Sequence, residues 1–183
     1  GKNICFNCSK NLSLKKLREV VNTPTIYDKK IPNKKLAVFR PIYHSGGRGF
    51  TVKEGPFEFN PTYYYATSYI KTDKEFRVFY CSNNGGQFLL CRRITYSEAR
   101  KNEKFQCRSA WGYVFWKRIP QKLKNATKIA FQHLGLDFGA ADVLYKNRKY
   151  YFCEINTAPT ADNPKIINFY KKNGFIISNN EGL

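Results

Sequence analysis

The sequence has no long apolar run and only two histidines. No stretch approaches the roughly 20 apolar residues that a membrane-spanning helix needs, and the start Gly1–Cys5 lacks the apolar core of a signal peptide. We therefore expect an intracellular protein without a membrane partner. His44 and His133 lie in unrelated contexts, and the sequence shows no Ser-His-Asp or Cys-His arrangement for nucleophilic catalysis.

Acidic residues are also scarce: 13 Asp and Glu stand against 32 Lys and Arg, which gives a formal net charge of +19. This excess favours a polyanionic partner, because one nucleoside triphosphate carries only about four negative charges. Nucleic acid, a ribosomal surface or an acidic peptide would each fit. The charge does not distinguish these partners from one another, or from a composition that is simply rich in lysine.

The six cysteines are scattered and lack the dense, regular spacing of a disulfide scaffold, so reduced thiols are expected. Cys5 and Cys8 form a CxxC, which is half of a zinc site. No second pair follows, and neither histidine completes the set. A lone CxxC is a weak match, and we do not predict zinc.

Hydrophobic and aromatic side chains are abundant. They make up 42% and 16% of the 183 residues, which predicts a folded protein despite the charge. This length fits one domain or two small lobes that share a cleft. We divide the chain into an N-terminal lobe over residues 1–70, with a glycine-rich loop, and a C-terminal lobe over residues 71–183.

Periodic patterns predict several elements. Residues 10–22 and 120–134 are expected to form helices. Strands are expected over residues 36–39, 63–70, 74–81, 88–93 and 111–116. The turn at Asn83–Gly86 makes its two flanking strands an antiparallel hairpin. The polar face of that hairpin carries Glu75 and Arg77, either as a cross-strand charge network or as contacts to a nucleotide.

Two further strand candidates carry three oxygen-bearing side chains, Asp142, Glu154 and Asn156. Glu154 and Asn156 are two residues apart, so a strand points both to one face, while Cys153 and Ile155 point into the core. Hard cations such as Mg²⁺ prefer oxygen ligands and bridge nucleotide phosphates. These three residues are therefore candidate magnesium ligands.

The alternative is that Asp142 and Glu154 are solvated positions on an ordinary hairpin whose turn is Tyr145–Lys149. We prefer the metal interpretation. An acid placed between packed residues such as Val143 and Phe152 is costly to bury without a cation or a hydrogen-bond partner.

A glycine-rich segment spans Ser45–Gly49, with Arg40 before it and Arg48 within it. Its glycines would let backbone N–H groups turn towards an anion, as in a phosphate cradle or a flexible lid. A tight hairpin turn is the alternative, and the glycines alone favour it, since short Gly runs are common in turns. The metal candidates reverse that preference.

Together these segments resemble the ATP-grasp superfamily, and most closely the branch of the ribosomal-protein glutamate ligases and their phage-encoded relatives. The resemblance covers roughly residues 36–160 and is most specific at Leu134–Asp142 and Glu154–Pro159. It implies an α+β ATP-grasp fold of two lobes whose antiparallel sheets grip ATP, with the N-terminal substrate domain reduced or absent. It also implies an enzyme of the cytoplasm of a bacterial or virus-infected cell. The implied activity is ATP- and Mg²⁺-dependent carboxylate–amine ligation through an acyl phosphate.

The resemblance also assigns roles to individual residues. The implied magnesium ligands are Asp142, Glu154 and Asn156. The implied nucleotide-binding residues are Arg40, Ser45, Gly46, Gly47, Arg48, Gly49, Tyr69, Ile70, Glu75 and Arg77. Within that set, the loop matches the lid over the phosphates, and Tyr69 with Ile70 matches the hinge that meets adenine. The implied catalytic cations, near the γ-phosphate or the acceptor carboxylate, are Arg92 or Arg93 and Arg108.

The chemistry agrees with this assignment. Attack of a carboxylate on a γ-phosphate joins two anions, so cations must neutralise charge and a closing loop must exclude water from the acyl phosphate. No protein nucleophile is required. The sequence departs from the pattern of its relatives at two points: Arg108-Ser109 replaces the Arg-Asn common in relatives, and few residues precede the first matched strand.

Two functions follow from these observations. The first is a ligase acting on a peptide or protein, with a basic surface that recruits an acidic or nucleic-acid-associated substrate. The second is a nucleic-acid-binding or virion-associated module on a degenerate ATP-grasp scaffold. The intact set of Asp142, Glu154 and Asn156 favours the first, and the net charge favours the second.

Overall fold

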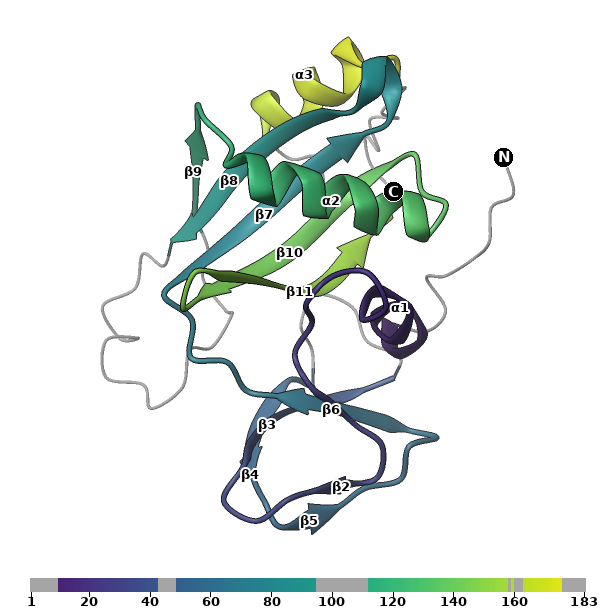
Figure 1. Ribbon diagram of the computed structural model, residues 1–183, viewed down its shortest axis with the longest axis vertical. Helices are drawn as coiled ribbons and strands as arrows, with labels where there is room; N and C mark the ends of the chain where they lie inside the picture. The colour runs from purple at the N-terminus through teal and green to yellow at the C-terminus, as the bar shows by residue number, and fades with distance from the viewer. Residues whose placement is uncertain (1–9, 43–48, 95–111, 158, 160–162, 176–183) are drawn as a thin grey trace, which may run out of the picture.

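The protein folds into two lobes that lie one above the other along its long axis (Figure 1). The computed structural model describes residues 10–42, 49–94, 112–157, 159 and 163–175. Both lobes are built on antiparallel sheets. The helices are α1 (Lys10–Leu17), α2 (Gln121–His133) and α3 (Pro164–Lys172). No helix in this part of the chain is long and apolar enough to span a bilayer.

The smaller lobe contains a four-stranded sheet in the order β1-β6-β3-β4. Its strands are β1 (Ile26–Tyr27), β3 (Leu36–Pro41), β4 (Thr51–Glu54) and β6 (Tyr64–Ser68), and beside them lies a ribbon of β2 (Lys30–Ile31) and β5 (Phe57–Glu58). An aromatic cluster holds the sheet to the ribbon. The Phe39 ring lies edge-on to Phe57 at 5.6 Å and stacks on Tyr64 at 4.7 Å. Such ring pairs stabilise a lobe too small for a large aliphatic core.

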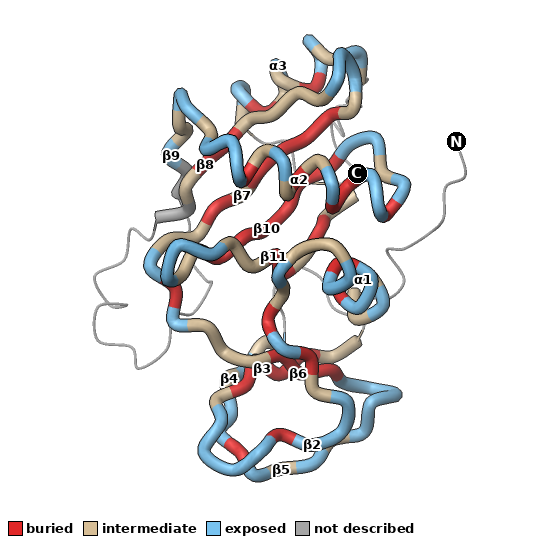
Figure 2. Tube along the Cα trace, viewed as in Figure 1, coloured by how far each residue is buried: buried red, intermediate tan, exposed pale blue. Residues whose placement is uncertain are grey.

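The larger lobe contains a five-stranded sheet in the order β11-β10-β7-β8-β9. Its strands are β7 (Lys74–Cys81), β8 (Gln87–Ile94), β9 (Gly112–Trp116), β10 (Phe138–Lys146) and β11 (Lys149–Asn156). Helix α2 covers one face through Leu123, Ala130 and Phe131, which pack on Val78 and Phe152. The central strands are the most buried part of the protein (Figure 2).

Helix α3 covers only part of the second face of this sheet. Polar side chains are found on the part that it leaves uncovered. Ile166 and Tyr170 of α3 pack on Phe79 and Cys81, so the C-terminal half of β7 is buried on both faces. The N-terminal half of β7 lies beyond α3, and its second face carries Glu75 and Arg77. The polar face expected on β7 therefore lies on the part of the second sheet face that α3 does not cover.

Helix α1 packs on the larger lobe, although the chain continues from it into the smaller lobe. Leu14 and Leu17 are buried in the core of the larger lobe. The helix ends at Leu17, five residues before the expected end at residue 22, and a series of turns follows in which Val21 N–H still bonds to the Leu17 carbonyl at 2.9 Å. The chain then enters the smaller lobe at β1.

The burial of the Cys81 thiol can be tested by chemical labelling. Burial raises the pKa of Cys81 to about 12 from an ordinary value of 9.0, because the thiolate would lose its hydration. Iodoacetamide at pH 8 should therefore leave Cys81 unlabelled in the folded protein and label it fully in urea, as read by peptide mass mapping. Since the fold favours the neutral thiol, this contribution to stability is present below pH 9 and is lost as the pH rises towards 12. Rapid labelling of the folded protein would contradict the burial.

Candidate nucleotide and metal site

The β10–β11 hairpin brings the candidate metal ligands together. Asp142 lies directly opposite Glu154, and Asn156 lies opposite Ala140, two residues along the same face. On its other side β10 pairs with β7, where Asp142 lies opposite Arg77. The three oxygen-bearing side chains thus share one face of two neighbouring strands, as their spacing predicts.

A β-bulge sets this arrangement. Val143 pairs with Phe152 while Asp142 pairs with Glu154, so Cys153 is an extra residue in β11. The bulge allows Phe152 to pack under α2 while Glu154, only two residues later, shares the face of Asp142. Cys153 is buried, as expected, with 7% of its surface exposed. Because strict alternation fails at the bulge, it also lines the cavity between the lobes.

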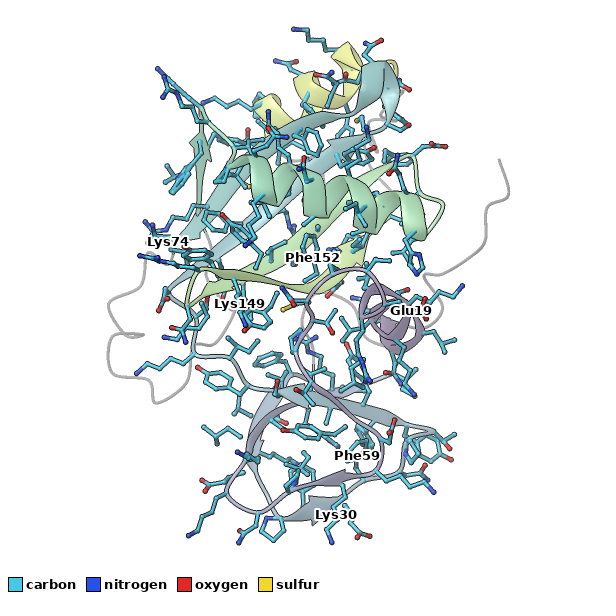
Figure 3. The ribbon with its side chains drawn as sticks, in the orientation of Figure 1. Glu19, Lys30, Phe59, Lys74, Lys149 and Phe152 are labelled. Atoms are coloured by element: carbon cyan, nitrogen blue, oxygen red, sulfur yellow. The ribbon has the colours of Figure 1, made fainter. Side chains whose placement is uncertain are left out.

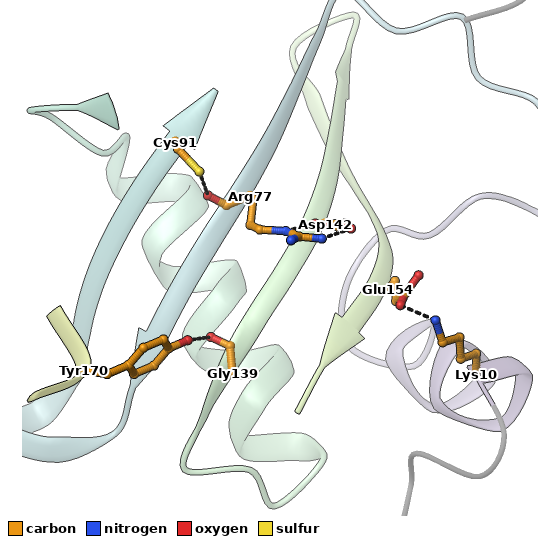
Figure 4. Close-up of polar contacts among 7 residues, drawn as sticks. All are labelled: Lys10, Arg77, Cys91, Gly139, Asp142, Glu154 and Tyr170. Atoms are coloured by element: carbon orange, nitrogen blue, oxygen red, sulfur yellow. Dashed lines mark hydrogen bonds and ion pairs between the residues drawn. The ribbon is translucent and has the colours of Figure 1, made fainter. Parts of the chain in front are cut away.

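Arg77 forms a bidentate ion pair with Asp142 (Figure 4). Its Nε donates to Oδ1 at 2.7 Å and its Nη2 donates to Oδ2 at 2.9 Å. Only 14% of the Arg77 side chain and 7% of the Asp142 side chain are exposed. The fork geometry of a guanidinium matches both carboxylate oxygens, which fixes the carboxylate in the plane of the pair.

Glu154 also has a cationic partner, which comes from α1. Lys10 Nζ lies 2.6 Å from Glu154 Oε1 (Figure 4). Since Asp142 is buried and Glu154 is largely so, the alternative of solvated hairpin positions is wrong. The structure nevertheless supplies protein cations for both acids, so burial alone does not require a metal.

The donor set fits Mg²⁺ chemically. Two carboxylates and one amide oxygen are hard ligands of the type this ion takes, and the register of β10 and β11 places them on one face. No group of three or more His, Cys, Asp or Glu side chains gathers as a metal site among the residues described. The proposed set does not need such a group, because its third member is an asparagine.

A narrow cavity lies between the lobes beside this face. Its walls include the predicted residues Arg40, Tyr69, Ile70 and Glu75, together with Leu14 of α1. The free volume is about 30 Å³, well below the several hundred Å³ of pockets that hold small-molecule ligands. The cavity in this conformation is therefore too small to enclose a nucleotide.

The hinge residues differ in what they offer an adenine. The Tyr69 N–H donates to the Leu36 carbonyl at 2.9 Å, so it is already engaged. Among the described residues, no backbone hydrogen bond outside the regular strands uses the Ile70 amide. Of the two expected hinge residues, Ile70 is therefore the better placed to meet a base.

Arg40 is a buried cation. It is 5% exposed, and its Nη1 reaches the Tyr65 hydroxyl at 3.3 Å. The guanidinium also lies over the rings of Phe50, at 5.2 Å, and Tyr65, at 5.8 Å. No ion pair formed within the described part of the chain involves Arg40. Glu75 also lines this cavity, but a buried guanidinium that has no ion pair within the described residues still favours an incoming anion.

The sheet register places the two adjacent arginine candidates opposite different residues of β7. Arg92 lies opposite Phe76, whose side chain is in the core on the α2 face, and the backbone of Arg93 pairs with that of Glu75. Arg92 is thus not brought together with Asp142. Further predicted residues, Ser45, Gly46, Gly47, Arg48 and Arg108, lie outside the described residues. Gly49 is described, with φ +73° and its α-carbon so close to Pro41 that a Cβ would lie 2.8 Å from Cγ.

Sequence reasoning missed the residues that support the site. The Tyr170 hydroxyl donates to the Gly139 carbonyl at 2.9 Å, which ties α3 to the start of β10 (Figure 4). Gly139 has φ +149°, and a Cβ there would lie 2.5 Å from the Asn156 carbonyl oxygen. A glycine at the start of a buried strand was the sequence signal for this close backbone approach.

Gly139→Ala should therefore displace the end of β11 that carries Asn156. We expect a loss of about 2 kcal/mol in the free energy of unfolding, as for other clashes at strained backbone positions. Urea denaturation measures this loss. Gly135→Ala is a matched control, since a Cβ there meets nothing within 4 Å although φ is also positive, at +65°. Equal losses in the two variants would show that the clash with Asn156 is unimportant.

Comparison with known proteins identifies the architecture. No protein-family model matches the sequence, and no curated protein matches it significantly. Many solved structures are similar in fold, and three of them show the range. D-alanine–D-alanine ligase from Bacillus anthracis has a TM-score of 0.58 at 16% identity, over 83% of this chain and 57% of the ligase. The ATP-grasp ligase PsnB, complexed with a minimal precursor, has a TM-score of 0.60 at 14% identity, over 85% and 53%.

The third is the macrocyclase MdnC from Microcystis aeruginosa MRC, bound with the precursor peptide MdnA. It has a TM-score of 0.53 at 14% identity, over 82% of this chain and 53% of MdnC. The chain therefore spans little more than half the length of the structures it matches. At these identities the likeness establishes the fold, and the expected two-lobed α+β ATP-grasp architecture is confirmed.

Proposed function

We propose that this chain binds ATP and Mg²⁺ as part of a carboxylate–amine ligase that acts on a peptide or protein. The observation that carries the proposal is the pairing of Asp142 with Glu154, with Asn156 on the same face, at the cleft of an ATP-grasp fold. The buried guanidinium of Arg40, which forms no ion pair within the described residues, adds a site for phosphate in the adjoining cavity. We retain the ribosomal-protein glutamate ligase branch and its phage-encoded relatives as the proposed affiliation, and the cytoplasm as the proposed location.

Asp142, Glu154 and Asn156 would hold the metal, which supplies neutralisation of the triphosphate charge when it is bound. Arg77 keeps the Asp142 carboxylate oriented. Arg40 contacts phosphate oxygens from the smaller lobe, and Ile70 meets the adenine edge. We propose Ser45–Gly49 as the lid over the phosphates, with Arg93 and Arg108 as further cations.

The reaction proceeds in two balanced steps. A substrate carboxylate oxygen attacks the γ-phosphorus, the bond from phosphorus to the bridging oxygen breaks, and ADP leaves as the acyl phosphate forms. An amine nitrogen then attacks the acyl carbon, inorganic phosphate leaves with the electron pair of the broken bond, and the amine loses a proton to solvent. The residues of the cleft position the anions and exclude water; none of them becomes covalently attached.

The named complexes of similar structures support the peptide substrate. PsnB is described in complex with its minimal precursor, Mg and ADP, and MdnC in complex with a precursor peptide. These are properties of those proteins. They are the reason that we place a peptide or protein, in preference to a free amino acid, as the substrate of this chain.

Nucleotide binding tests the proposal directly. Calorimetric titration with ATP in the presence of MgCl₂ should give micromolar binding, and Arg40→Met should weaken it about tenfold, the loss of one charge-assisted contact. Lys171→Met, an exposed change on α3, should have no effect. Release of ADP that depends on an added peptide library then tests ligation. Absence of Mg-ATP binding by the folded protein would overturn the proposal.

A further inference from the structure

A groove lies on the opposite side of β11 from the candidate site. It has a volume of about 470 Å³ and is bounded by α2, by the turn that follows α1 and by β11. Figure 3 labels Phe152 and Lys149 on the β10–β11 hairpin, with Phe152 beneath α2. Because Phe152 and Glu154 face opposite sides of the sheet, the groove is separate from the cavity between the lobes.

The floor of the groove is apolar. Val21, Ala126, Tyr150 and Phe152 line it, and Ile129 on α2 remains 46% exposed beside them. A half-exposed isoleucine next to a hydrophobic hollow is the kind of surface that another chain covers.

The rim of the groove is basic. Arg18, Lys122 and Lys149 are all exposed, and no aspartate or glutamate lines the groove. None of the ion pairs within the described ranges involves these three residues, whereas nearby Lys146 is paired with Asp73 at 2.9 Å. Within the part of the chain that the structure describes, the cations of the rim therefore have no ion-pair partner.

Helix α2 increases this positive potential. It begins at the groove, has no acidic residue in its first turn, and receives no side-chain cap at its N-terminus. The partial positive charge of a helix N-terminus thus adds to Lys122. Glu19, an acid of the neighbouring turn, is engaged by His133 at 3.0 Å, at the other end of α2.

We propose that this groove docks an acidic peptide segment that carries at least one apolar side chain. Carboxylates would meet the three cations of the rim, and the apolar side chain would cover Ile129 on the floor. The Phe152 N–H donates to the Asn22 carbonyl at 2.8 Å. It is therefore not available to pair with the backbone of a peptide beside β11. The segment therefore docks through its side chains and not as an added strand.

A peptide fits these features better than a nucleic acid does. Nucleic-acid surfaces combine positive charge with aromatic faces on which bases stack. Here the aliphatic Val21, Ala126 and Ile129 make up much of the floor, and both of its rings, Tyr150 and Phe152, are intermediate or buried. An aliphatic floor with a basic rim is complementary to alternating acidic and apolar side chains.

Fluorescence anisotropy with defined probes tests the proposal without nucleotide. The probe is a labelled 15-residue peptide of repeated Glu-Glu-Leu, and the comparison probes are its Leu→Ser version and a 15-nucleotide oligothymidylate. We expect the Glu-Glu-Leu peptide to bind with micromolar affinity and its Leu→Ser version at least tenfold more weakly. The double variant Lys122→Glu/Lys149→Glu should lose at least tenfold in affinity for the first peptide.

The matched control is Lys171→Glu/Lys172→Glu on α3, which makes the same charge change on the far side of the larger lobe. It should alter the affinity less than threefold. Ile129→Gln keeps the charge constant and should weaken peptide binding at least fivefold, even if the double variant does not fold. Circular dichroism establishes which variants are folded.

Three outcomes overturn the proposal. The first is that the Glu-Glu-Leu peptide fails to bind or binds no more tightly than its Leu→Ser version. The second is an equal loss in the groove and α3 variants, which would reduce the interaction to net charge. The third is loss of oligothymidylate binding in the groove variant without peptide binding, which would make the groove a nucleic-acid surface. None depends on ATP or Mg²⁺, so the proposed ligase activity stands or falls separately.

Discussion

Asp142→Asn should lower the free energy of unfolding by about 3 to 5 kcal/mol, the cost of leaving one partner of a buried ion pair unmatched. Arg77 is 14% exposed and its fork donates to both Asp142 oxygens. An asparagine offers one acceptor oxygen and turns its NH₂ donor towards the guanidinium. Urea denaturation followed by circular dichroism measures the loss.

A double variant shows how much of this loss comes from leaving Arg77 without its charged partner. Arg77→Met/Asp142→Leu removes both charges and retains packing volume, so it should recover most of the stability lost in Asp142→Asn. Asp73→Asn is the matched control, because its partner Lys146 lies at the surface and the pair is 35% and 46% exposed. Asp73→Asn should lower the free energy of unfolding by less than about 1 kcal/mol. An equally small decrease in Asp142→Asn would mean that water or another group takes the place of the carboxylate beside Arg77.

The long, strongly patterned elements were predictable. Residues 74–81 match β7 to the residue, because charged and apolar side chains alternate with a period of two. The helix expected over residues 120–134 is α2, whose apolar stripe includes Leu123 and Ala130. The hairpin of β10 and β11 follows from two apolar runs with a short polar turn between them.

Short elements and α3 were missed for physical reasons. Strands β1, β2 and β5 have two residues each, too few to show a period. Helix α3 carried a local signal in Asn163, whose side chain accepts the Lys165 N–H at 2.9 Å, and in the spacing of Ile166 and Tyr170. That signal did not reveal that α3 covers half of a sheet face, because coverage depends on tertiary contacts.

The face of the candidate ligands was predictable, but their partners were not. Asp142 and Glu154 could be placed on adjacent strands from spacing alone. Lys10 is 144 residues from Glu154 in sequence, and nothing local joins them. The bulge at Cys153 was hidden for the same reason: a register shift appears only when the pairing of Val143 with Phe152 is known. Each of these features is non-local.

Glu154→Gln should produce the largest functional loss. It should weaken Mg²⁺-dependent ATP binding about 100-fold, the upper end of the effects seen when a metal's ligand surroundings are disturbed. ADP formation should fall by at least about the same factor. The substitution keeps the shape of the side chain but halves its oxygen donors and removes its charge. Calorimetric titration at fixed MgCl₂, repeated in EDTA, isolates the metal-dependent part of the affinity.

Two controls assign that loss to the metal. Glu58→Gln changes an exposed carboxylate of the smaller lobe and should have no effect on ATP binding. Lys10→Gln removes the partner of Glu154 but leaves the carboxylate, so the Mg²⁺ dependence of ATP binding should persist. If Lys10→Gln abolishes that dependence as fully as Glu154→Gln, the ion pair with α1 is what binding requires. Glu154 would then serve to hold the helix against β11, and the magnesium assignment would fail.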